Sequence, residues 1–267
     1  MDFLNENLTY IMAGISVGGQ YALIAIGYTM VYGILRLINF AHGEIFMASG
    51  FMMVYLSAVL PWFIAVPIVI VSTVLLGFIV ERVAYKPLRT APRMSIMISA
   101  IGISYLIQNV AWYVTSGLAK QYPVIPWISN SVYIGDSTTK MVTLATPVLT
   151  LFLVTALVFL IKYTKIGMAM RAVSRDFETS QLMGIKINSV ISATFIIGSF
   201  LAAVGSILYF SNYTTVTPIS GAMPGLKAFV AAVFGGIGSI PGAVLGAFII
   251  GISESIIKAL GWTTFSD

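Results

Sequence analysis

The sequence predicts an all-α, polytopic integral membrane protein, a helix bundle of about eight hydrophobic elements with glycine-rich breaks. Its 267 residues are 58% hydrophobic and only 9% charged, with a mean hydropathy of +0.98. A soluble domain has roughly 25% charged residues. Apolar stretches of membrane length fill most of the chain, and the cations gather in two short loops. These three observations also argue against nucleic-acid binding, because the cations lie beside apolar spans rather than along one exposed face.

The hydrophobic elements follow from the length that a bilayer requires. A helix needs about 20 apolar residues to cross a membrane, and six uninterrupted stretches come close to this length: 8–35, 45–60, 62–80, 94–116, 141–161 and 190–212. A seventh stretch, 228–260, contains the run GGIGSIPG at 235–242. Each Gly costs a helix about 1 kcal/mol and each Pro about 3 kcal/mol. We therefore expect two helices joined by a bend there.

The orientation follows from the two basic loops, 81–93 and 162–186. Lys and Arg in short loops stay on the cytoplasmic side, so both loops are expected to face the cytosol. The loops 117–140 and 213–225 and the acidic amino terminus then face outward. The two basic loops hold nine of the 14 Lys and Arg residues: Arg82, Lys86, Arg89, Arg93, Lys162, Lys165, Arg171, Arg175 and Lys186.

Two irregular segments lie at or near membrane depth, 36–44 and 235–242. Unpaired backbone groups cost several kcal/mol in lipid, so such segments persist only when they are buried in protein or line a wet cavity. Breaks of this kind often mark a transport path. A plain cytoplasmic turn is an equally good interpretation of 36–44, and a structural hydrogen bond is a more ordinary role for its histidine. The candidate path residues are Asn39, His42, Gly43, Glu44, Gly235, Gly236 and Gly238.

The second basic loop is long for a plain connector. Its run KIGMAMRAVSRDFETSQLMGI, beginning at Lys165, has a weakly amphipathic helical pattern. Such a helix could place an apolar face in a groove of a soluble partner, with Arg175, Asp176 and Glu178 fixing its orientation. We expect a docking helix within a cytoplasmic coupling segment, 162–189.

Several kinds of chemistry are excluded. The sequence has no cysteine and one histidine, and it has no GxxxxGK[ST] loop to hold a nucleotide. It also has no Ser/His/acid set, paired-carboxylate cleft or metal-ligand spacing. We expect a transport subunit rather than an enzyme, with no cofactor and no bound metal, so that any energy source must be supplied from outside the chain.

Four runs in the same order, 21–47, 81–89, 165–185 and 225–247, resemble the permease subunit of bacterial branched-chain amino-acid ABC importers of the high-affinity leucine, isoleucine and valine type. The resemblance implies a single permease domain over 1–267 in the bacterial inner membrane. It also implies three kinds of protein partner: a homologous second permease, two cytosolic ATPase subunits and an extracytoplasmic binding protein. It places the coupling helix at 174–185, with ATPase-coupling residues Ser174, Arg175, Asp176, Glu178, Leu182 and Gly184.

Other functions fit the same pattern. An ion-coupled secondary transporter could use the break at 36–44 without an ATPase, and a passive channel would need no long cytoplasmic helix. An ABC permease for another small solute, such as a sugar, a nucleoside or a urea-like compound, would share the fold. Members of the family that the chain resembles usually continue beyond the position of Asp267, so we expect a further carboxyl-terminal span to be missing here.

Overall fold

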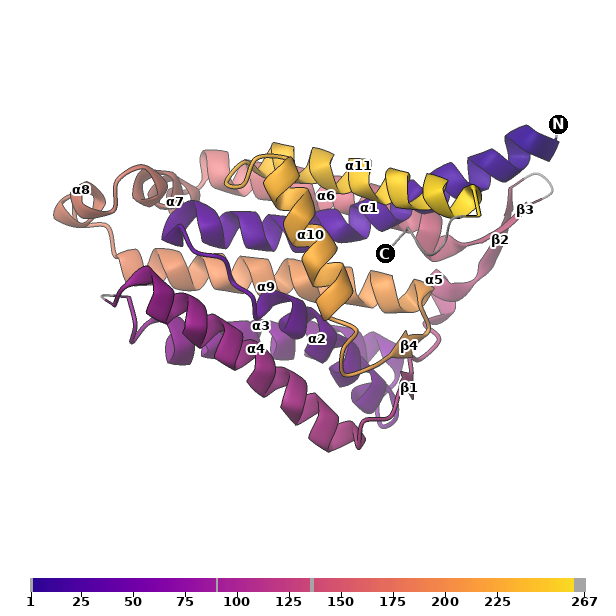
Figure 1. The fold of residues 1–267 in the computed structure, drawn as a ribbon, viewed down its shortest axis with the longest axis horizontal. Coiled ribbons are helices and arrows are strands. Elements are labelled where there is room, and N and C mark those ends of the chain that lie inside the picture. Colours follow the sequence, from indigo (N-terminus) through magenta and orange to yellow (C-terminus); the bar gives the residue numbers. More distant parts are fainter. Residues whose placement is uncertain (1, 90, 135–136, 262–267) are drawn as a thin grey trace.

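Long helices run side by side along the longest axis of the molecule, which we take as the membrane normal (Figure 1). The structure, a computed structural model, describes residues 2–89, 91–134 and 137–261. The end of the chain at Asp267, where a further span is expected to follow, lies outside the described residues.

Within the described residues, eight apolar helices form the bundle, which confirms the predicted fold class. Six described helices are long and apolar enough to cross a bilayer: α1 (Asp2–Leu35), α3 (Trp62–Val80), α4 (Arg93–Thr115), α6 (Met141–Tyr163), α9 (Ile187–Asn212) and α11 (Ile240–Ala259). Two are too short to span a bilayer, α2 (His42–Ser57) and α10 (Ala222–Phe234). At 1.5 Å per residue these two reach only part of the way across a core of about 30 Å.

Helices α1 and α9 lie at the centre of the bundle, and small residues let their neighbours approach closely. A Cβ added to Gly18 would lie 2.8 Å from the Cα of Phe248, and one added to Gly251 would lie 2.3 Å from the amide nitrogen of Gly18. Helices in lipid associate largely through such close van der Waals packing. The α1–α11 contact therefore depends on glycines that face each other.

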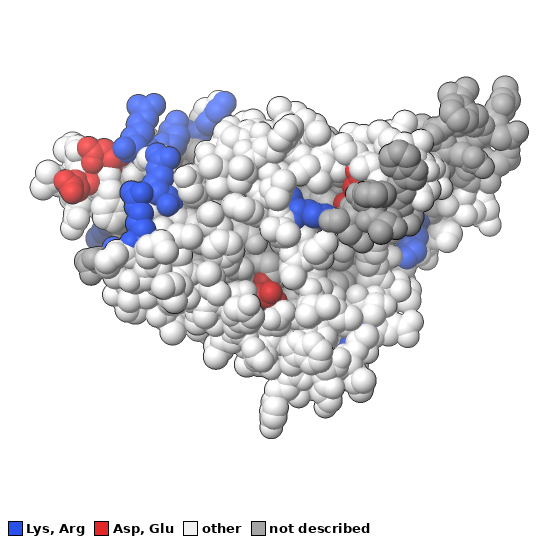
Figure 2. Space-filling model, in the orientation of Figure 1, with Lys and Arg blue, Asp and Glu red and all other residues white. Residues whose placement is uncertain are grey.

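The two ends of the bundle differ in charge. One end carries α7 (Lys165–Arg175) and α8 (Phe177–Leu182), and Lys and Arg gather over them in Figure 2. The other end carries α5 (Pro126–Ser129), the pair β1 (Lys120–Gln121) with β4 (Thr215–Val216), and the pair β2 (Ser131–Ile134) with β3 (Ser137–Lys140), both antiparallel. By the positive-inside rule, the α7–α8 end faces the cytosol.

Several element boundaries differ from the predicted ones, and three of the differences bear on the basic loops and on the second break. Helix α3 continues through a π-helical turn, η1 (Glu81–Tyr85), so the first basic loop begins at Lys86 rather than at Glu81. The cause is a buried anion: Glu81 bonds to Arg89 and accepts a hydrogen bond from Ser192 Oγ at 2.9 Å. Helix α10 begins at residue 222 rather than 228, with Pro224 in its first turn, where a helix tolerates proline. The predicted docking helix is divided into α7 and α8 at Asp176.

Candidate functional site

The break after α1 turns back into the bundle instead of forming an exposed cytoplasmic turn. Helix α1 ends at Leu35, Arg36 adopts a left-handed backbone conformation with φ of 54°, and α2 begins at His42. Asn39 and His42 are only 1% and 2% exposed. Of the two interpretations of residues 36–44, the structure therefore supports the embedded break over the plain cytoplasmic turn.

Asn39 fixes the path of this break. Its Oδ1 accepts hydrogen bonds from Tyr85 Oη at 2.8 Å and from the backbone N–H of Ala41 at 3.2 Å. Buried backbone groups need such partners, since an unsatisfied one costs about 1–3 kcal/mol. Asn39 thereby joins the start of α2 to η1.

His42 packs in a notch on the helices behind the break. A Cβ on Gly27 would lie 2.1 Å from His42 Nε2, and one on Gly198 would lie 3.7 Å from His42 Cε1. The ring also meets Tyr28 edge-on, with the centroids 5.0 Å apart. The imidazole thus fills a space that two glycines leave, and it is absent from the lining of the pocket described next.

The short helices α2 and α10 meet at their amino termini. A Cβ on Gly43 would lie 2.7 Å from the carbonyl oxygen of Gly221, and one on Gly225 would lie 3.1 Å from the Cα of Gly43. The residues before the two helices, Ala41 and Gly221, supply no side-chain cap. Two helix amino termini, each the positive end of a dipole, therefore converge inside the bundle. In α10 the Ala222 N–H bonds to the Ile219 carbonyl and Pro224 has no N–H, so this terminus acts mainly through its dipole.

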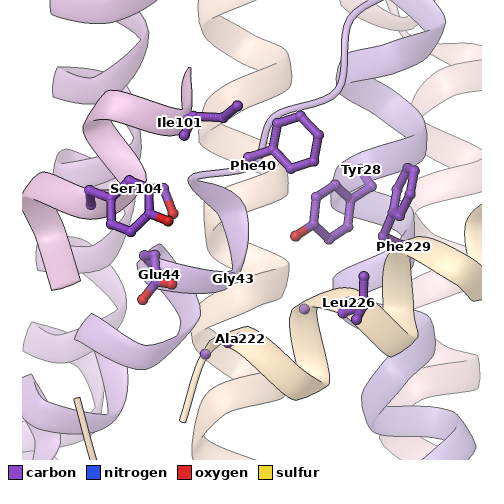
Figure 3. Close-up of a pocket in the computed structure, with 12 residues that line it drawn as sticks. Tyr28, Phe40, Gly43, Glu44, Ile101, Ser104, Ala222, Leu226 and Phe229 are labelled. Carbon is purple, nitrogen blue, oxygen red and sulfur yellow. The ribbon is translucent and has the colours of Figure 1, made fainter. Parts of the chain in front are cut away.

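A pocket of about 310 Å³ opens beside this junction (Figure 3). Its polar side carries Glu44 of α2 and Ser104 of α4, whereas Phe40, Leu226 and Phe229 give it an apolar side. Glu44 is only 6% exposed, and its Oε2 has no hydrogen-bond partner among the described residues. Of the predicted path residues, Gly43 and Glu44 line this pocket, whereas Asn39 and His42 support it from behind.

The predicted path residues of the second break lie elsewhere. Gly235, Gly236 and Gly238 form the turn between α10 and α11, outside the pocket lining, and Gly236 and Gly238 have φ values of 91° and 98°. A Cβ on Gly235 would lie 1.9 Å from the carbonyl oxygen of Gly242, so this turn is a close packing bend. Their role in a path stays a prediction.

Sequence reasoning missed the residues that face Gly43 across the junction. Gly221, Ala222 and Gly225 belong to the run TPISGAMPG, which the sequence analysis assigned to an outward loop. The signal was present, since a run of small residues with two prolines ahead of an apolar helix is typical of an embedded break. Glu254 belongs to a different buried cluster: it bonds to Tyr21 at 2.9 Å, Lys227 at 3.2 Å and Lys258 at 2.6 Å.

At the cytosolic end, local hydrogen bonds define α8. Asp176 caps its amino terminus, with Oδ1 accepting from the Thr179 N–H at 3.1 Å and Oδ2 from the Thr179 hydroxyl at 2.5 Å. These bonds lower the pKa of the Asp176 carboxyl below its ordinary value, so the cap is ionised at neutral pH. At the other end, Ile185 N–H bonds to the Ser180 carbonyl and Gly184 N–H to the Gln181 carbonyl, with Gly184 left-handed at φ of 81°. This pattern is a Schellman motif, which favours glycine.

Helix α8 presents apolar side chains to solvent. Leu182 is 87% exposed, Met183 78% and Phe177 42%. Large apolar side chains that gather on an aqueous surface typically mark a protein contact. Behind them, Arg36 Nη2 donates to the Ser174 carbonyl at 3.2 Å, so the end of α7 contacts the start of the embedded break. Arg175 ends α7, and Glu178 lies in the first turn of α8.

The fold and the site define a class of protein, a multi-pass membrane helix bundle with an embedded pocket and a helical segment at its cytosolic end. Comparison with known families is specific: the family model described as the permease component of the branched-chain amino acid transport system matches residues 10–267. The chain belongs to this family. No solved structure matches it.

Several relatives align with nearly the whole length of the chain. The high-affinity branched-chain amino acid transport system permease protein LivH of Salmonella typhimurium is 39% identical over 95% of this chain and 87% of the relative. The corresponding BraD protein of Pseudomonas aeruginosa is also 39% identical, over 97% and 88%. The ribose import permease protein RbsC of Haemophilus influenzae is more distant, at 24% identity over 99% and 81%.

Proposed function

We propose that the chain is the membrane-spanning subunit of an ATP-driven importer that moves branched-chain or similar small amino acids inward by alternating access. The observation that carries the proposal is the direct connection between the α7–α8 segment and the embedded pocket. The names of the relatives that are 39% identical support the substrate class. The chain itself supplies no nucleotide loop, so hydrolysis belongs to partner subunits.

The connection to α7 is one hydrogen bond, and a second bond holds the break against η1. Arg36 ties the start of the break to the Ser174 carbonyl of α7, and Asn39 ties its middle to Tyr85 of η1. A movement of α7 and α8 that follows closure of the ATPases would pull on the break and tilt α2, whose first turn lines the pocket. Packed elements with two discrete arrangements can transmit such a movement. In this scheme Ser174, Arg175, Asp176, Glu178, Leu182 and Gly184 form or position the ATPase contact.

The expected partners account for the exposed surfaces. Two cytosolic ATPases would cover the apolar residues of α8, and an extracytoplasmic binding protein would dock at the end that carries α5 and the short strands. A homologous second permease would cover the open side of the pocket, where Ile101 and Tyr105 of α4 are 41% and 61% exposed. The chain thus supplies one wall of the path.

Reconstitution of the complete transporter in proteoliposomes tests this proposal. We expect leucine uptake to need ATP, the ATPases and the binding protein. The variants Glu178→Lys and Leu182→Glu change exposed α8 residues, so both are expected to lower uptake at least tenfold without loss of folded permease; a contact of this kind is worth about 1.4 kcal/mol or more. Arg82→Glu, a charge reversal of an exposed η1 residue outside α8, is the matched control.

The competing functions predict different results. Uptake driven by an ion gradient without ATP would establish a secondary transporter, and solute conductance through the lone chain would establish a channel. Wild-type uptake by both α8 variants would refute the docking surface. Failure of the wild-type complex to move any branched-chain amino acid, together with uptake of a sugar or nucleoside, would reassign the substrate.

A further inference from the structure

We infer that Glu44 binds the ammonium group of an amino-acid substrate, while the amino terminus of α10 faces the carboxylate of the same molecule. This inference rests on the proposed function and adds the groups that would recognise the substrate inside the membrane. It concerns the pocket shown in Figure 3.

Glu44 is a buried acid that has no ion-pair partner among the residues that the structure describes. Each of the two other buried acids that the structure describes is neutralised: Glu81 pairs with Arg89, and Glu254 pairs with Lys227 and Lys258. Only 6% of the Glu44 surface is exposed, yet the residue forms no ion pair within the described ranges. Its Oε2 has no hydrogen bond there either. An acid at membrane depth usually faces a cavity and marks a functional site.

The surroundings of Glu44 favour an organic cation over a metal ion. The described residues contain no group of three or more His, Cys, Asp or Glu side chains that could hold a metal. A single carboxylate with a nearby hydroxyl, Ser104, suits an ammonium group, which forms charge-assisted hydrogen bonds. Glu44 lies in the first turn of α2, where the positive end of the helix dipole favours a negative charge.

The start of α10 favours a negatively charged group, whereas Glu44 favours a positively charged one. Gly221, Ala222 and Gly225 line the pocket, and no side chain caps this 13-residue helix. Figure 3 shows Glu44 beside the start of α10, at the same side of the cavity. Broken membrane helices of transporters commonly point their amino termini at anionic substrate groups. A molecule with adjacent positive and negative groups can therefore bridge α2 and α10.

The other side of the pocket fits an aliphatic side chain. Phe40 and Phe229 lie with ring centroids 6.5 Å apart, and Phe229 and Tyr28 lie 5.9 Å apart. Leu226 completes this apolar surface. The volume of about 310 Å³ lies at the lower end of ligand pockets, which span roughly 300–1,000 Å³. The chemistry selects a small zwitterion with an apolar side chain and disfavours sugars and 2-oxo acids.

Cysteine protection tests the assignment, because the chain has no cysteine of its own. In the complete reconstituted transporter, Ile101→Cys places one thiol in the pocket lining, and its rate of maleimide labelling is measured against leucine concentration. Leucine is expected to protect this thiol. Adding Glu44→Gln should raise the leucine concentration for half-protection about 10- to 100-fold, as expected for loss of a charge-assisted bond. Glu44→Asp should retain most of the protection.

Two controls make the result specific. Ser72→Cys, in an apolar groove between α2, α3 and α4, should show no protection by leucine. A second control uses two ligands in the Ile101→Cys pocket that retains Glu44: 3-methylbutylamine has only the ammonium group, and 4-methylpentanoate has only the carboxylate. The amine is expected to protect better than the acid. Should Glu44→Gln fail to assemble, this pair of ligands decides the question, and better protection by the acid overturns the inference.

The outcomes separate the inference from the proposed function. ATP-driven leucine uptake with unchanged half-protection in Glu44→Gln overturns the role of Glu44 and leaves the function intact. Absence of leucine uptake, with protection by another ammonium compound that Glu44→Gln abolishes, supports the role of Glu44 and overturns the substrate assignment.

Discussion

The cytosolic segment α7–α8 and the embedded pair α2–α10 begin their helices in different ways. Helix α7 is capped by Thr164, whose Oγ1 accepts from the Gly167 N–H at 3.1 Å, and α8 is capped by Asp176. Helices α2 and α10 begin after Ala41 and Gly221. The methyl group of alanine cannot accept a hydrogen bond, and glycine has no side chain. Other helices also lack side-chain caps, such as α3 and α4, but these begin at the ends of the bundle, where water can reach their first turns.

The comparison shows how the environment determines what a helix terminus can do. In water, a side-chain cap competes with solvent and stabilises a short helix by about 0.5–2 kcal/mol. Inside a membrane, an uncapped amino terminus retains its partial positive charge and N–H donors for a ligand. The α7–α8 segment therefore stabilises its own helix termini, whereas the amino termini of α2 and α10 are left to interact with a bound ligand.

The largest effect is expected where α2 and α10 touch. A Cβ on Gly221 would lie 2.3 Å from the Gly43 carbonyl oxygen, so Gly221→Ala must push the two helices apart. Overpacking of this kind costs about 1–3 kcal/mol of unfolding free energy, and the pocket should lose its shape. Thermal unfolding in detergent and leucine uptake measure the two losses. Gly102→Ala, with nothing within 4 Å of the added Cβ, is the control, and equal effects of the two variants would disprove the contact.

A smaller effect is expected at the hydrogen bond between the break and η1. Tyr85→Phe removes one buried bond, worth about 1 kcal/mol, whereas Asn39→Ala removes the acceptor of two buried bonds of about that size. The asparagine variant should therefore lose more stability and more ATP-coupled uptake. Chemical denaturation and ATPase assays of the assembled transporter provide the comparison. Equal losses would mean that the amide does not organise the break.

The carboxyl end of α8 should respond more weakly still. Gly184 has a left-handed backbone, which costs a residue with a Cβ about 1 kcal/mol. Gly184→Ala should fray α8 and lower substrate-stimulated ATPase activity, while leaving the pocket unchanged. Gly184→Asn, which tolerates this conformation, should behave more like the wild type. Hydrogen exchange of the α8 amides reports the fraying, and a uniform change across the bundle would contradict a local role.

The smallest effect is expected for Asp176→Asn, because asparagine caps a helix about as well as aspartate. Since the folded pKa of Asp176 is lowered, its ionised cap contributes stability above the unfolded pKa of about 3.9 and loses it as the pH falls through the folded value. Between about pH 6 and 8, the protection of α8 amides should therefore stay constant in the wild type. Asp176→Ala should lose that protection, and a wild-type change near pH 7 would indicate another titrating group.

The sequence was sufficient for the features that arise from local composition. Apolar length defined the helices, the Lys and Arg of two loops defined the cytosolic end, and the run from Lys165 indicated helical structure there. These features are readable because each depends on residues that are near one another in the chain. The caps at Asp176 and Gly184 are local as well, since a helix cap involves only the next few residues, but the sequence analysis predicted one helix across Asp176 and missed the division there.

Only the tertiary structure decided which breaks meet. The sequence pointed to Gly43 and Glu44 at one break and to Gly235, Gly236 and Gly238 at the other, but the packing placed Gly43 against Gly221 and Gly225. It also buried Glu81 and Glu254 with partners far away in the chain and left Glu44 with none among the described residues. The physical reason is that local sequence determines whether a segment can be helical and apolar, whereas the partner of a buried charge or a bare glycine depends on which helices pack around it.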